Sequence, residues 1–175
     1  MDIAAKDAAI AAFRNEYPGA VDAGRGHPAV RGCEEISWSE FPECPAGIPI
    51  LLYGLLDEAA ADEAQRVFTD VMFCLTGMNP AVPEALPFLL RLAAEPRVPE
   101  RSALLALLAY VAGCSEPTDG LGEAAQWWFG SDADHPERER CRAVFTEHAD
   151  VVAALPDGLT RPDDRAKLRW AAGLP

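Results

Sequence analysis

Two strongly apolar segments joined by a proline-containing hinge constrain the fold of this chain most. They are PFLLRLAA and SALLALLAYVAG, which flank EPRVPER within residues 87–113. Pro99 has no backbone N–H and is tolerated at the first position of a helix, so we expect a helix over 99–113. Its apolar side chains surround the helix axis. Because such a helix must be covered on most sides, we expect it to lie between the helix before it and the helix after it.

Hydrophobic residues at helical spacing predict helices in most of the remaining chain. The clearest pattern, within 58–76, is the stripe Ala64, Val67, Phe68, Val71, Met72 and Leu75. A stripe of this kind is typical of a helix that packs against one neighbour. No segment shows the alternation of a strand. We therefore predict an all-α single domain over 1–175, made of an N-terminal helix (1–17), an irregular arm (18–47) and helices in 48–113 and 114–175. The last part includes helices near 121–129, 136–155 and 161–172.

Part of the chain resembles a known class of helical repeats. The resemblance rests on IPILLYGLL (48–56), EAQRVFTDVMFCL (63–75) and ALPFLLRLAAEPRVPERSALLALLAYVAG (85–113), with Trp38 upstream. These segments are similar to HEAT-like repeat proteins of actinobacteria. The resemblance implies a short α-solenoid of antiparallel helix pairs, in a class that mostly binds proteins and includes immunity proteins for toxins. The turn TGMNP (76–80) departs from the His- and Tyr-bearing turn of that group.

The charge of the chain indicates which partners it attracts. Asp and Glu number 28 against 15 Lys and Arg, a net charge of −13 that is spread along the sequence. Such a field repels nucleic acid and anionic lipid and attracts basic proteins, although acidity can also serve solubility alone. No signal peptide or membrane span is predicted. Five cysteines without a CxxC pair favour free thiols and a cytoplasmic location.

Acidic residues surround aromatic ones in the arm, which is what a basic partner requires. The alternative is a solvated loop whose Ile36, Trp38 and Phe41 dock on the helices. Trp127, Trp128 and Phe129 are consecutive, so one core face cannot take all three. We expect them to bridge several helices, the alternative being an exposed contact surface. The predicted partner-binding residues are Glu34, Glu35, Trp38, Glu40, Phe41, Glu43, Trp127 and Trp128.

Other reactive side chains favour structural roles. Cys141 and His148 share a helix face, but seven residues separate them by about 10 Å along the axis, which is too far for a nucleophile–base pair. His27, Cys33 and Cys44 lack the spacing and the fourth ligand of a zinc site. With no nucleotide or hydrolase motif either, we predict no catalytic residue, cofactor or metal.

Three arginines, Arg161, Arg165 and Arg169, recur every fourth residue on the last predicted helix. Like charges at this spacing repel, so we expect neighbouring acids to oppose them, helped by an ion pair between Asp163 and Lys167. A nucleic-acid contact is the alternative, and the net charge of the chain argues against it.

These observations lead to two hypotheses of function. The first is a non-enzymatic module that binds a basic protein through an acidic surface, with an immunity or antitoxin-like role as its most concrete form. The second is a small-molecule-binding protein or enzyme. Its pocket would lie between helices or under the 18–47 arm, enclosed by Trp38, Tyr53 and Trp127.

Overall fold

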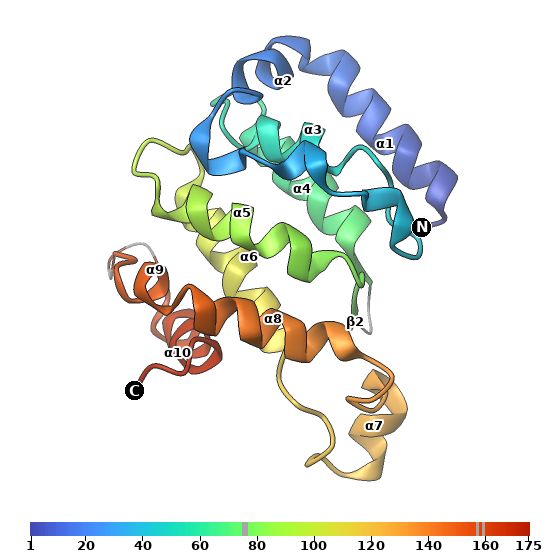
Figure 1. Ribbon diagram of the computed structural model, residues 1–175, viewed down its shortest axis with the longest axis vertical. Coiled ribbons are helices and arrows are strands. Elements are labelled where there is room, and N and C mark those ends of the chain that lie inside the picture. Colours follow the sequence, from blue (N-terminus) through green and yellow to red (C-terminus); the bar gives the residue numbers. More distant parts are fainter. Residues whose placement is uncertain (75–76, 157, 159) are drawn as a thin grey trace.

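The computed structural model describes residues 1–74, 77–156, 158 and 160–175, and nearly all of its elements are helices (Figure 1). The first half holds α1 (Ile3–Glu16), α2 (Pro18–Gly24), the 3₁₀ helices η1 (Pro28–Val30), η2 (Cys33–Glu35) and η3 (Trp38–Glu40), α3 (Ile48–Gly54) and α4 (Ala61–Met72). The second half holds α5 (Val82–Ala94), α6 (Arg101–Cys114), α7 (Glu123–Phe129), α8 (Pro136–Glu147), α9 (Ala149–Ala153) and α10 (Pro162–Ala171). The prediction of an all-α fold is confirmed.

One small hairpin interrupts the helices. Strands β1 (Phe73–Cys74) and β2 (Gly77–Met78) pair antiparallel, with Phe73 opposite Met78. The sequence did not predict this hairpin, because two residues per strand are too few to show alternation. Leu75, the last residue of the predicted stripe, lies outside the described residues.

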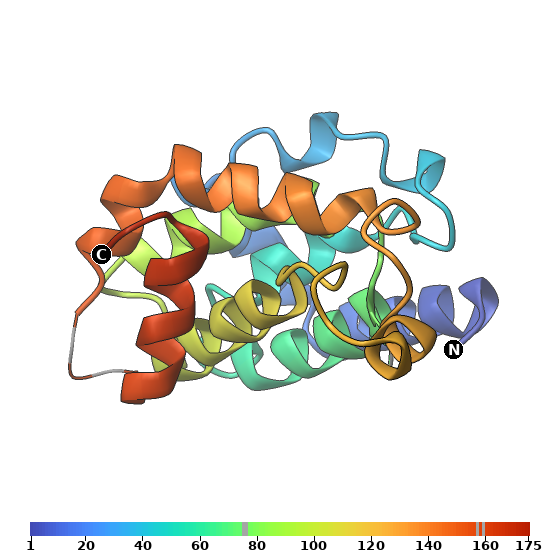
Figure 2. The same ribbon diagram turned by 90° about the horizontal axis from the view of Figure 1, so that it is seen from below.

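The helices follow one another along the long axis of the molecule in roughly the order of the sequence (Figure 1), and Figure 2 shows the molecule along that axis. Helices α1 to α4 occupy one end and α8 to α10 the other, while α7 protrudes beyond them. Helix α6 is covered on most sides, as predicted, but its neighbours are α5, α8 and above all α10. The helix that follows it in sequence, α7, does not cover it. No helix among the described residues combines the length and apolar character that crossing a bilayer requires.

The core runs through both halves. The described members of the predicted α4 stripe are all buried, as are Leu104, Leu105, Leu107, Leu108 and Val111 of α6. Gly54 allows α1 to approach this core closely. A Cβ at that position would lie 2.4 Å from Cζ of Phe13 and 2.9 Å from Cβ of Ala64. A side chain there would push α1 away from α3 and α4.

The 18–47 segment is more ordered than predicted. It contains α2 and three 3₁₀ helices, because Pro18 starts a helical turn at a position where its missing N–H costs nothing. Trp38 is buried, and its indole N–H donates to the carbonyl of Cys33 at 2.8 Å. Lys6 Nζ on α1 donates to the carbonyl of Glu43 at 2.9 Å. These contacts agree with an arm that its aromatic residues fix to the helices.

The C-terminal helices end differently from the prediction. The helix expected over 136–155 is divided into α8 and α9, because His148 leaves the helical conformation (φ −106°, ψ 28°). Arg161 is the N-cap residue of α10. Thr160 is therefore not the capping residue that the sequence suggests. Both helices still bury apolar residues, among them Phe145, Val152 and Leu168.

Candidate partner-binding site

Three large aromatic side chains of α7 face solvent. Trp127 is 78% exposed, Trp128 61% and Phe129 45%, and the two indoles meet edge to face with centroids 4.9 Å apart. Helix α7 makes no extensive contact with any other helix or strand of the described chain. The expectation that these rings bridge several helices is therefore wrong, because α7 extends past the helices they would have joined. The structure instead leaves all three rings exposed, where the alternative expected this of one ring.

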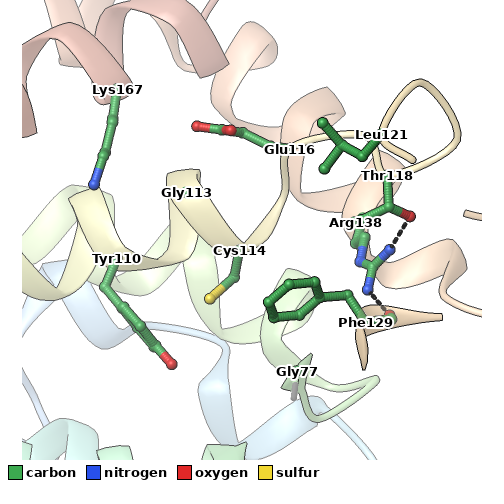
Figure 3. Close-up of a pocket in the computed structure, with 10 residues that line it drawn as sticks. All are labelled: Gly77, Tyr110, Gly113, Cys114, Glu116, Thr118, Leu121, Phe129, Arg138 and Lys167. Carbon is green, nitrogen blue, oxygen red and sulfur yellow. Dashed lines mark hydrogen bonds between the residues drawn. The ribbon is translucent and has the colours of Figure 1, made fainter. Parts of the chain in front are cut away.

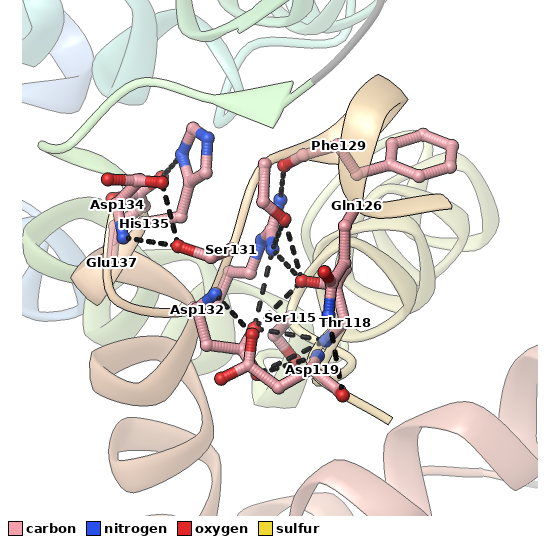
Figure 4. A network of polar contacts seen from close by, with 12 residues as sticks. Ser115, Thr118, Asp119, Gln126, Phe129, Ser131, Asp132, Asp134, His135 and Glu137 are labelled. Carbon is pink, nitrogen blue, oxygen red and sulfur yellow. Dashed lines mark hydrogen bonds and ion pairs between the residues drawn. The ribbon is translucent and has the colours of Figure 1, made fainter. Parts of the chain in front are cut away.

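The segment that carries α7 is fixed at both ends by a buried guanidinium. Arg138 of α8 is 4% exposed and donates to Oγ1 of Thr118 at 2.8 Å (Figure 3) and to the carbonyl of Gly130 at 3.4 Å. Figure 4 shows Thr118, Asp119 and Asp132 among the polar residues of this network. It also donates to the carbonyl of Phe129 and to Oδ1 of Asp132, the latter at 3.3 Å. Thr118 precedes α7, whereas Phe129 is its last residue and Gly130 and Asp132 follow it. Arg138 thus closes the loop around this helix.

Asp132 also connects the two segments that flank α7, through hydrogen bonds with Thr118 and Asp119. Its carboxylate accepts hydrogen bonds from the backbone N–H groups of Thr118, at 3.0 Å, and of Asp119, at 3.3 Å. The backbone N–H of Asp132 in turn donates to the Asp119 carboxylate at 3.0 Å. The N–H of Thr118 is the main cause that holds the pKa of Asp132 below its ordinary value, followed by that of Asp119 and by Arg138. The charged carboxylate is therefore the form that holds the loop.

A turn beside the network needs glycine. Gly130 has φ +72°, a left-handed conformation that other residues rarely adopt. A Cβ there would also lie 2.6 Å from Nε2 of His135. The imidazole of His135 is held by Glu137, whose Oε1 lies 2.8 Å from Nδ1. The chain leaves α7 in this turn and enters α8.

The charge around α7 is of one sign. Residues 115–135 contain no Lys or Arg and five acids, which are Glu116, Asp119, Glu123, Asp132 and Asp134. All except Asp132 are exposed. Leu121, 51% exposed, adds an aliphatic side chain close to the aromatic ones. We call the exposed side chains of Leu121, Trp127, Trp128, Phe129, Glu116, Asp119 and Glu123 the α7 surface.

The structure does not support the other predicted partner-binding group in full. Trp38 is 2% exposed and Phe41 is half-buried, so Trp38 cannot serve as an anchor for a partner. Its ring packs inside because the indole N–H finds an acceptor within the arm. Glu34, Glu35, Glu40 and Glu43 are exposed, and Glu34 pairs with Arg25 at 3.1 Å. Figure 1 places this segment beside α1 and α3, whereas α7 lies at the opposite end of the long axis.

The remaining candidates have local partners of their own. Nδ1 of His27 accepts from the N–H of Ala29, and the thiol of Cys33 donates to Oη of Tyr53 at 3.5 Å. Burial raises the pKa of the Cys44 thiol to about 11. Within the described ranges no group of three His, Cys, Asp or Glu side chains could hold a metal ion.

Cys141 and His148 are held separately. The Cys141 thiol is buried 3.6 Å from Sδ of Met78, and burial raises its pKa to about 12. Nδ1 of His148 lies 3.2 Å from the carbonyl of Val144. Neither side chain reaches the other, so they form no nucleophile–base pair.

Two arginines of the α10 row, Arg161 and Arg169, have different kinds of partner. Arg161 pairs with Asp164 at 2.8 Å, while Arg169 donates to the carbonyl of Pro175. The predicted ion pair between Asp163 and Lys167 is not formed among the described contacts. Lys167 instead borders a cavity between α6, α10 and the loop that precedes α7 (Figure 3).

This cavity, of about 540 Å³, contains residues that the sequence did not indicate. Trp38 and Tyr53 are buried in the N-terminal half and Trp127 is exposed, so the enclosed pocket predicted from these three does not form. The cavity is lined instead by Tyr110, Leu121, Phe129, Arg138 and Lys167, among others. A search for similar proteins finds no matching family, no matching curated protein and no matching solved structure.

Proposed function

We propose that the protein binds a basic protein partner through the α7 surface. The observation that carries this proposal is the exposure of three consecutive aromatic residues on a helix whose two ends are fixed by Arg138. Tryptophan is the residue most enriched among those that dominate binding energy. Each ring brings a large contact area with little conformational freedom to lose. A helix that is already held in place also loses less entropy on binding than a mobile loop.

Charge favours a basic partner. The five acids of 115–135 and the net charge of −13 produce a field that accelerates the approach of a cationic surface. Lys or Arg side chains of the partner can also lie over the indole faces, where the ring quadrupole attracts them. Anionic surfaces would be repelled at the same place.

An immunity or antitoxin-like role is the most concrete form of this proposal. A cationic nuclease would be steered to the acidic surface, and the protruding helix would block access to its active site sterically. The HEAT-like interpretation is part of the same proposal. It is supported by the packing of consecutive helices, α3 with α4 and α5 with α6. The five cysteines, all free thiols, fit a reducing cytoplasm.

The test is a comparative pull-down from the native host with the full-length chain as bait. The wild type is compared with Trp127→Ala/Trp128→Ala and with Glu116→Gln/Glu123→Gln. The matched controls are Trp170→Ala, which removes a 45% exposed indole from α10, and Glu34→Gln/Glu35→Gln, which removes exposed acids of the arm. Partners are identified by mass spectrometry and re-measured as purified proteins.

We expect a basic protein that the wild type and both controls retain and both α7 variants lose. Its affinity should fall about tenfold or more in the tryptophan variant, since truncation of a dominant contact residue costs at least about 2 kcal/mol. The proposal is wrong if every specific partner survives both α7 variants, or if the retained partner is acidic.

A further inference from the structure

The cavity beside α7 has the size and the walls of a small-molecule site. Its volume of about 540 Å³ lies within the range of about 300 to 1,000 Å³ that is typical of ligand pockets. The walls come from the end of α6, the loop of residues 115–121, the last residue of α7, α8 and α10. The aromatic rings of Tyr110 and Phe129 line it from two different helices (Figure 3). They are 46% and 45% exposed, so both retain apolar surface that a ligand could cover.

The inner wall carries no free charge. Burial raises the pKa of Tyr110 to about 12, and burial also raises the pKa of the Cys114 thiol, so both are neutral at pH 7. Arg138 borders the cavity, but its guanidinium already donates to Thr118, Gly130, Phe129 and Asp132. It has an acid beside it and is buried. The apolar part of a ligand therefore meets uncharged surface.

The rim carries one positive and one negative side chain, and the two do not pair with each other. Lys167 and Glu116 both line the cavity, and within the described chain neither forms an ion pair. In Figure 3 they lie along one edge, opposite Tyr110 and Phe129. The ammonium of Lys167 reaches α6, since a Cβ at Gly113 would lie 3.9 Å from Nζ. The rim thus offers one cation and one carboxylate beside an apolar interior.

We propose that this cavity binds a free α-amino acid with an aromatic or large aliphatic side chain. The side chain would lie between Tyr110 and Phe129, the carboxylate at Lys167 and the ammonium at Glu116. The charge of the surroundings selects this class. An apolar anion would satisfy Lys167 but meet the five acids of residues 115–135, and an apolar cation would satisfy Glu116 but meet Lys167. A zwitterion satisfies both groups and has no net charge for the field to repel.

Three ligands that share a phenylethyl group test the proposal by isothermal titration calorimetry on the full chain. They are L-phenylalanine, 2-phenylethylamine, which lacks the carboxylate, and 3-phenylpropionate, which lacks the ammonium. We expect L-phenylalanine to bind with a Kd of about 1 mM or lower. Each analogue should bind about tenfold more weakly, because it loses one charge-assisted contact. No binding of L-phenylalanine, or equal binding of all three ligands, overturns the proposal.

Variants assign the two ends of the ligand. Lys167→Gln should weaken L-phenylalanine about tenfold but should not weaken 2-phenylethylamine, which has no contact with Lys167 to lose and is repelled by its charge. Glu116→Gln should weaken L-phenylalanine but should not weaken 3-phenylpropionate, which has no contact with Glu116 to lose and is repelled by its charge. Arg97→Gln removes an exposed cation that does not line the cavity and should change nothing. If either rim variant weakens all three ligands equally, the assignment of carboxylate and ammonium is wrong.

A cavity-filling variant tests the location. A side chain at Gly113 has room, because its Cβ would meet only Lys167, at 3.8 Å or more. Gly113→Leu should fold at least as stably as the wild type, since glycine is a poor helix former, and should abolish L-phenylalanine binding. Gly19→Leu on α2, where a Cβ meets nothing within 4 Å, is the matched control and should bind normally. Binding that survives Gly113→Leu places the ligand elsewhere and overturns the proposal.

The two proposals are separable. Trp127 and Trp128 do not line the cavity, so Trp127→Ala/Trp128→Ala should retain L-phenylalanine while it loses the protein partner. Lys167→Gln should lose the amino acid and retain the partner, because Lys167 is outside the α7 surface. The binding results for the two variants therefore show which of the two proposals has failed.

Discussion

The guanidinium of Arg138 donates a hydrogen bond to Oγ1 of Thr118 at 2.8 Å, and this contact joins α8 to the loop that enters α7. The same side chain donates to the carbonyl of Phe129, where α7 ends. One buried residue therefore positions a helix that packs closely against no other element of the described chain. The position of Trp127 and Trp128 therefore depends on the hydrogen bonds of Arg138.

Arg138→Met should destabilise the protein. The substitution leaves the carbonyl of Phe129 without its donor and Asp132 without its counter-charge, at a cost of about 3 kcal/mol in the free energy of unfolding. Urea unfolding at pH 7 measures it. Arg140→Met, on the exposed face of the same helix, loses only a surface ion pair with Glu84 and should cost less than about 1 kcal/mol. Equal losses of unfolding free energy in both variants would show that Arg138 does not hold the α7 segment in place.

The stability of the protein should fall in acid through Asp132. Hydrogen bonds from Thr118 and Asp119 and the charge of Arg138 lower the pKa of its carboxyl in the folded state. The stabilisation is then fully present above the unfolded-state pKa of about 3.9 and is lost as the pH falls through the lower folded-state value. Asp132→Asn should be less stable than the wild type at pH 7, and the difference should shrink towards pH 2. A difference that stays constant over this range would contradict the assignment.

The burial of α6 should be measurable by comparing one buried leucine of this helix with one exposed leucine outside it. Leu105→Ala removes a fully buried side chain and should lower the free energy of unfolding by about 3 kcal/mol. Leu121→Ala, in the loop before α7, truncates the same side chain where it is 51% exposed and should cost about 0.5 kcal/mol or less. Urea titration of both variants checks this. Comparable losses would mean that Leu121 is packed rather than available to a partner.

Much of the helical core can be predicted from the sequence. The α4 stripe, with Val67 and Phe68, and the leucines of α6 repeat at helical spacing, and burial follows from that spacing. The ends of helices are less predictable. Pro99 predicts a start for α6, but the helix begins at Arg101 because Glu100 adopts a left-handed conformation, with φ +49°. Glutamate rarely adopts a left-handed conformation, so the sequence does not predict it at this position.

The site could be predicted only in part. Trp38 and Trp127 both lie among acidic residues and look alike in the sequence. The first is buried because its N–H reaches the carbonyl of Cys33 and its ring reaches the core, whereas α7 makes no extensive contact with another helix of the described chain. That difference arises from tertiary packing. The cavity was not predictable for the same reason, since Tyr110, Phe129 and Lys167 come from three helices at unrelated positions in the chain.

The most direct test of partner binding at α7 is the association and dissociation kinetics of the partner, once it has been identified by the pull-down. Stopped-flow tryptophan fluorescence would follow binding between about 20 and 200 mM salt, a range over which the Debye length falls from more than about 20 Å to less than 10 Å. We predict an association rate that falls at least about tenfold over this range, and a dissociation rate that rises in Trp127→Ala/Trp128→Ala but not in Trp170→Ala. An association rate indifferent to salt, together with a dissociation rate that the α7 variant leaves unchanged, would contradict the account.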